Sequence, residues 1–154
     1  DEVNQALVIG EEGHGVWSLA YKDAASVPIE IDTIAANNGL VADVEGVSIW
    51  RGQEGKGWIV ASAQAADRYV VYERLAPHAV MGVFTLVANT QEGIDEVTHT
   101  DGLDVFSGAL PGYPRGMLVV QDDGNPAKEQ NQNFKMIDWS SVETALGLPI
   151  LEAE

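Results

Sequence analysis

The sequence predicts an all-β protein made of antiparallel sheets. Short apolar strands alternate with turns that are rich in glycine, proline and aspartate, which is the usual pattern of antiparallel structure. A strand–turn–strand unit also recurs along the chain with a period of roughly 50 residues, a spacing typical of propeller blades. We therefore expect about three β-propeller blades, each a four-stranded antiparallel sheet.

The strands follow one another in the same order in each repeat. An apolar strand is predicted at 6–12, 57–64 and 116–121, and its return strand at 15–19, 68–74 and 133–137. The second and third repeats have an upstream partner strand at 43–50 and 100–105. Alternating segments at 27–32 and 79–86 are predicted to be outer strands.

One short helix is predicted near the C-terminus. Ser140 and Glu143 have the spacing of a capping box, and Gly147 and Pro149 end the helical pattern. No linker or low-complexity stretch interrupts residues 1–154, so we expect a single domain without an internal boundary.

The composition restricts the partners. The chain has 24 acidic and 8 basic residues, a formal charge of −16, which disfavours nucleic acid and anionic membranes. A polyanionic substrate is also disfavoured unless bound divalent cations reverse the local charge. The absence of cysteine excludes disulfides, thiolate nucleophiles and cysteine zinc sites. The alternative is that the acidic residues only keep a secreted or halotolerant protein soluble.

Carboxylates stand at the start of the upstream strands in two repeats. Asp43 and Glu45 lie where the strand of the second repeat begins, and Asp101 lies where that of the third begins. In a propeller these positions converge on the axis, where the carboxylates would repel one another unless cations lay between them. Carboxylates together with the amide oxygens of Gln64 and Asn125 suit Ca²⁺ better than zinc or copper. The alternative is that the Asp-Gly pairs only mark turns.

These motifs, in this order, resemble those of the β-propeller phytases. The matching segments are DVEG at 43–46, ASAQ at 61–64, YVVYER at 69–74, TDGLDV at 100–105, PRGMLVVQD at 114–122 and NQNFK at 131–135. The resemblance covers nearly the whole chain and corresponds to the C-terminal half of a six-bladed family member. The family's N-terminal half, with its DDPAxW segment and most of its basic phosphate-binding residues, has no counterpart in this sequence.

The resemblance implies a calcium-dependent phytase that hydrolyses phosphomonoesters of calcium-phytate with a metal-activated water. Several Ca²⁺ ions are the implied cofactor, and phytate or other inositol phosphates the implied substrates, in a secreted or periplasmic protein. Glu45 and Asp101 would act in catalysis through the metal. The positions that match family calcium ligands are Glu2, Asp43, Glu45, Gln64, Asp95, Asp101 and Asn125. The sequence departs from the family at Gly124, where a glutamate ligand is usual, and at Glu96, where a glycine is usual.

Three blades cannot close a ring, so we expect a partner. The partner would be the N-terminal half of the propeller or a second copy of the chain, and the isolated chain is expected to be a poor catalyst. The sequence begins at Asp1 rather than methionine, which we interpret as a mature product, a recombinant piece or a fragment. The competing hypothesis is a non-catalytic, calcium-stabilised propeller fragment that binds a ligand or a partner.

Overall fold

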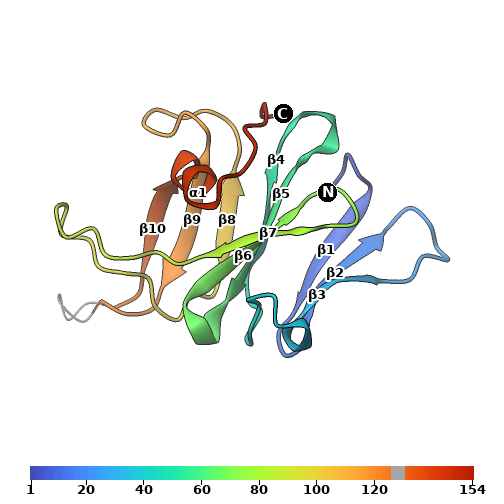
Figure 1. The fold of residues 1–154 in the computed structure, drawn as a ribbon, viewed down its shortest axis with the longest axis horizontal. Coiled ribbons are helices and arrows are strands. Elements are labelled where there is room, and N and C mark those ends of the chain that lie inside the picture. The colour runs from blue at the N-terminus through green and yellow to red at the C-terminus, as the bar shows by residue number, and fades with distance from the viewer. Residues whose placement is uncertain (126–130) are drawn as a thin grey trace.

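The computed structural model describes residues 1–125 and 131–154 and shows three antiparallel sheets side by side (Figure 1). The first sheet contains β1 (Ala6–Glu11), β2 (Gly15–Ala20) and β3 (Ile29–Thr33). The middle sheet contains β4 (Val47–Arg51), β5 (Gly57–Ala63), β6 (Arg68–Glu73) and β7 (Val80–Phe84). The third contains β8 (Leu103–Phe106), β9 (Met117–Asp122) and β10 (Asn133–Asp138). Short 3₁₀ turns lie at Ile34–Ala36, Gln53–Gly55 and Gln64–Ala66.

The all-β prediction is confirmed, and every predicted strand segment contains a strand. The middle sheet has the four strands expected, in the order β4-β5-β6-β7. In the part of the chain that the structure describes, the first and third sheets have three strands each. The strands β1, β5 and β9 occupy the same place in the repeat. Compared with the middle sheet, the first sheet therefore lacks the strand that would pair with β1, and the third lacks the strand that would pair with β10, among the described residues.

The two central strands of the middle sheet, β5 and β6, are buried on both faces. Every residue of β5 is buried, and its side chains alternate between two cores. Trp58 and Val60 face the third sheet, where they pack with Val105 and Leu118, whereas Ile59 faces the first sheet. The outer strands β1 and β10 instead alternate between partly buried and exposed residues. The three sheets are therefore joined by apolar packing through the middle one.

The helix α1 (Trp139–Leu146) forms where predicted, but its N-cap differs. Asp138 is the N-cap, and its side chain accepts a hydrogen bond from the Ser140 backbone N–H, so the predicted capping box is wrong. Glu143 is buried and pairs with Arg115 instead, at 2.7 Å. Gly147 ends the helix in the left-handed conformation, as expected. No helix among residues 1–125 and 131–154 is long and apolar enough to cross a membrane.

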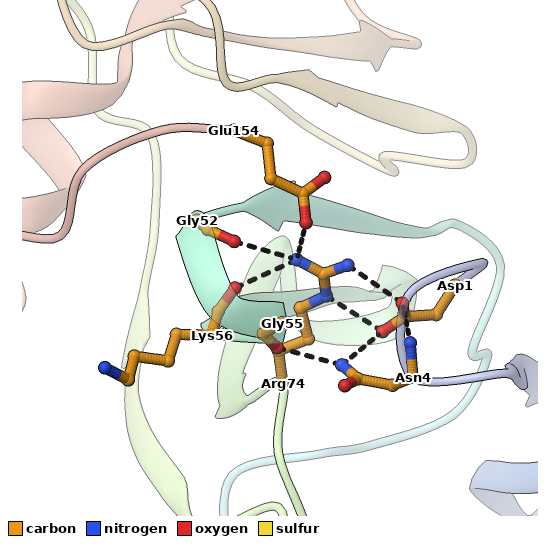
Figure 2. Close-up of polar contacts among 7 residues, drawn as sticks. All are labelled: Asp1, Asn4, Gly52, Gly55, Lys56, Arg74 and Glu154. Carbon is orange, nitrogen blue, oxygen red and sulfur yellow. Dashed lines mark hydrogen bonds and ion pairs between the residues drawn. The ribbon is translucent and has the colours of Figure 1, made fainter.

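A buried arginine connects distant parts of the chain (Figure 2). The Arg74 side chain is 1% exposed, and its guanidinium binds both carboxylate oxygens of Asp1, each at 2.8 Å. The same group donates to Glu154 Oε1 at 3.0 Å and to the backbone oxygens of Gly52 and Lys56 at 3.3 and 3.0 Å. Arg74 thus holds the two chain ends against the β4–β5 turn, and we call this group the Arg74 cluster.

Candidate metal centre

Three carboxylates from two sheets meet at the place where β1 ends and β4 begins. Glu12 follows β1, and Asp43 and Glu45 lie just before β4. The backbone N–H of Val44 donates to Glu12 O at 3.0 Å, which brings the two segments together. One carboxylate oxygen from each of Glu12, Asp43 and Glu45 lies within 4.8 Å of the others. We call these three residues the acidic cluster.

Asp101 from the third sheet approaches the same segment. Ser62 is fully buried; its Oγ accepts from Gly46 N–H at 2.7 Å and donates to Asp101 O at 2.9 Å. A Cβ on Gly46 would lie 2.8 Å from both Asp101 O and Leu103 N. Only glycine permits this close approach of the two backbones, so Gly46 has a steric role beyond marking a turn.

Polar contacts orient the Asp101 side chain. The Gln64 amide Nε2 donates to Asp101 Oδ1, and the Gln64 backbone N–H donates to Asp43 O at 2.9 Å. The Asp101 N–H in turn donates to Gln121 Oε1 at 2.8 Å. Gln64 therefore touches both predicted carboxylate segments, and Asp101 is fixed at its backbone and at its side chain.

The electrostatics favour a bound cation. Desolvation raises the pKa of the Glu45 carboxyl, and the negative charges of Glu12, Asp101 and Asp43 raise it further. Like charges placed so close together are costly when all are ionised, and a divalent cation between them removes this cost. The available ligands are carboxylate and amide oxygens from separate strands, a donor set that fits Ca²⁺. The residues therefore fit the metal that the sequence suggested.

Comparison with known proteins identifies the family of the chain. The phytase family model matches residues 1–150, almost the whole chain. The chain belongs to the phytase family. A curated relative, the 3-phytase of Bacillus subtilis (strain 168), is 34% identical over 144 residues, which cover 92% of this chain and 37% of the relative. The chain thus spans little more than a third of the length of this curated phytase.

The ligand positions suggested by the family resemblance do not all lie at one place. The structure brings Asp43, Glu45, Gln64 and Asp101 together. Asp95 lies in the segment between β7 and β8, where its carboxylate pairs with Lys135 of β10 at 2.9 Å.

Two further predicted ligands lie in other surroundings. Asn125 is buried; its Oδ1 accepts from Asn133 Nδ2 at 2.6 Å, and its Nδ2 donates to Asn131 O at 2.9 Å. Glu2 is exposed and adjoins Asp1, which belongs to the Arg74 cluster. That cluster lies at the Gly57 end of β5, whereas Gln64 follows the opposite end, so Glu2 is not brought to the acidic cluster.

The structure adds Glu12 to the candidate ligands. Sequence motifs alone did not single it out, because its approach to Asp43 depends on a contact between two different sheets. A signal was nevertheless present. Glu12 directly follows the first repeated strand, at the place that Gln64 occupies after the second. Aligning the repeats by strand ends would have identified it.

Proposed function

We propose that the chain forms part of a calcium-dependent phytase, a secreted or periplasmic enzyme that removes phosphate from phytate or related inositol phosphates. One observation carries the proposal: carboxylates next to all three sheets gather where β1 ends and where β4 and β8 begin. These carboxylates belong to Glu12, Asp43, Glu45 and Asp101. Membership of the phytase family supports the choice of substrate. The whole enzyme's activity is proposed because the chain covers 37% of its curated relative.

In this proposal the three sheets are propeller blades. The four-stranded middle sheet is one complete blade, and each outer sheet is a blade that takes a further strand from elsewhere. Apolar side chains face outward at both ends: Leu7 and Ile9 on β1, and Phe134 and Met136 on β10, are 40% to 71% exposed. Such surface suits burial against further blades, supplied by an N-terminal half or a second copy.

The residues of the chain have distinct roles in this proposal. Bound calcium would make the acidic end attractive to phosphate, polarise phosphoryl oxygens and lower the pKa of bound water. Glu12, Asp43, Glu45, Asp101 and the amide oxygen of Gln64 would hold the ions, and Gln64 Nε2 would orient Asp101. We assign Glu45 and Asp101 a catalytic role through ligation rather than as proton carriers.

The remaining predicted ligands are treated separately. Asn125 would serve a different ion from those at the acidic cluster, since it has its own polar surroundings. We leave Asp95 out of the ligand set because its carboxylate already binds the Lys135 ammonium group. We leave Glu2 out of the ligand set because its neighbour Asp1 is bound to Arg74 at the other end of the sheet.

A non-catalytic, calcium-stabilised binding module is the second candidate. One observation favours it: Arg74, Arg115 and Lys135 are all paired with carboxylates, so these three cations are not available to bind phosphate. In a catalytic function, basic residues other than these three, from this chain or from further blades, would bind the phosphate groups.

Phosphate release from phytate tests the proposal. We expect the complete enzyme, with all blades present, to release inorganic phosphate at neutral pH in the presence of calcium. Release should stop when a chelator removes the calcium. Supplying calcium again should restore release, which controls for irreversible unfolding. If no phosphate is released while calcium still raises the melting temperature, the binding-module function stands and the phytase function is rejected.

The exposed apolar side chains of the outer strands β1 and β10 predict that copies of the isolated chain associate. The isolated chain is expected to sediment as a dimer or larger species, because open sheet faces expose more apolar surface than a monomer usually tolerates. Phe134→Ser with Met136→Ser should shift the distribution towards monomer. Ile150→Ser removes an equally exposed side chain away from the outer strands and should leave it unchanged. A monomeric wild-type chain of full stability would contradict the open-blade arrangement.

A further inference from the structure

The Lys135 ammonium group occupies a cage of four oxygens. Its Nζ lies 2.9 Å from Asp95 Oδ1, 2.8 Å from Asp95 O and 2.8 Å from Asp122 Oδ2, and it also donates to Glu96 O. The Lys135 side chain is 11% exposed and that of Asp122 is fully buried. Carboxylate and carbonyl oxygens from separate segments are the usual surroundings of a hard metal cation. Here a side chain of the protein supplies the positive charge.

Asp122 extends this cage along the chain. Its second oxygen, Oδ1, accepts a hydrogen bond from the Thr98 backbone N–H at 2.9 Å. The Asp123 N–H donates to Thr98 O at 3.0 Å. Residues 95–98 are therefore attached to the ends of β9 and β10 through both carboxylate oxygens of one buried aspartate.

The attachment continues to Asp101. Thr100 is fully buried, and its Oγ1 accepts from the Tyr69 hydroxyl at 2.7 Å. The Asp101 N–H donates to the Gln121 side chain, and Gln121 precedes Asp122 on β9. One continuous polar network thus runs from Lys135 along residues 95–101 to the carboxylate that lies beside the acidic cluster.

We propose that Lys135 is a positioning residue: its ammonium group acts as a built-in cation that holds residues 95–101 and so places the Asp101 carboxylate at the acidic cluster. Its effect on calcium rests on the proposed function, whereas its effect on residues 95–101 does not. A tethered ammonium does not dissociate as an ion does. Residues 95–101 therefore keep their place when calcium is removed, and Asp101 is preorganised for the next ion.

Lys135→Met tests this role because methionine keeps most of the side-chain length and loses the charge. In chelator, we expect the amides of Thr98 and Asp101 to exchange with deuterium at least about tenfold faster than in the wild type. Calcium affinity, measured by titration calorimetry, should fall by about tenfold to a hundredfold, the range for groups that orient a metal ligand. Asp122→Asn keeps an acceptor for Thr98 and removes the facing charge, so it should give smaller changes in the same direction.

Leu148→Ala is the matched control, because it removes buried apolar contacts near α1 without touching this network. It should lower stability and leave both calcium affinity and the relative exchange of residues 95–101 unchanged. Exchange in both Lys135→Met and Asp122→Asn that matches this control would overturn the positioning role. Fast exchange with wild-type calcium affinity would also overturn it, by separating Lys135 from Asp101. If the wild type binds no calcium, the proposed function fails, and exchange at the Asp101 amide alone decides the role of Lys135.

Discussion

Replacing Arg74 with methionine is expected to lower the free energy of unfolding by about 3–5 kcal/mol, the usual cost of removing one partner from a buried ion pair. The Asp1 carboxylate is 3% exposed and would stay buried without its countercharge. The backbone oxygens of Gly52 and Lys56 would also lose their shared donor. For a chain of this size the loss corresponds to a fall in melting temperature of roughly 6–20 °C.

Denaturant titration measures this loss, and Arg51→Met provides the control. Arg51 is exposed at the end of β4, so its replacement should change the unfolding free energy by less than about 0.5 kcal/mol. Equal stability of the two variants would show that the contacts of Arg74 only offset the cost of burying its charge.

Replacing Glu45 with glutamine at the acidic cluster is expected to remove most of the stability that calcium adds. In the wild type, calcium at a hundredfold excess over its Kd should add about 2.7 kcal/mol to the free energy of unfolding. The variant should lose most of this gain, because an amide is a weaker ligand than a carboxylate. In chelator at neutral pH the variant should be more stable than the wild type, because one repelling charge has been removed.

The pH dependence provides an independent check. The pKa of Glu45 is raised in the folded protein, so folding favours its protonated form. In chelator, its favourable contribution is present below the ordinary carboxyl pKa and is lost as the pH rises through the raised value. The stability of the wild type should therefore approach that of Glu45→Gln as the solution is acidified. Glu92→Gln removes an exposed charge in the 89–94 turn and should show neither effect.

Activity distinguishes ligation from proton transfer. In the complete enzyme, Glu45→Gln and Asp101→Asn should each lower phosphate release by at least about tenfold, the lower bound for disturbing a metal ligand's surroundings. Higher calcium should recover part of the loss. If these residues carried protons, calcium would recover nothing and the pH profile would lose one limb. Unchanged turnover in both variants would remove them from the catalytic site.

The strands could be predicted from the sequence because their signals are local. Glycine and proline turns mark their ends, and alternation marks their faces, so β2 and β5 begin at the predicted residues. The number of strands in each sheet depends on pairing between distant segments, which local patterns do not report. The predicted N-cap of α1 was wrong for a similar reason. Glu143 has the spacing of a capping box, but a pair with Arg115 across the fold competes for its carboxylate.

The candidate site divides in the same way. The proximity of Asp43, Glu45 and Asp101 was predictable because each stands where the first strand of its repeat begins. Glu12 required the contact between the first and middle sheets, which brings it to Val44. The position of Glu2 depends on its neighbour Asp1 binding Arg74, which lies 73 residues away in sequence. Side chains placed by long-range contacts of this kind cannot be located from spacing alone.

The Arg74 cluster also bears on the connectivity of the chain. Asp1 and Glu154 bind the same guanidinium, so two residues far apart in the sequence meet at one side chain (Figure 2). In the isolated stretch 1–154, a short loop could join them without disturbing a strand, and the exposed turn at 22–25 could be opened instead. Such a circular permutant keeps every pairing of the three sheets. The order in which the sheets follow one another along the backbone is therefore separable from their arrangement in space.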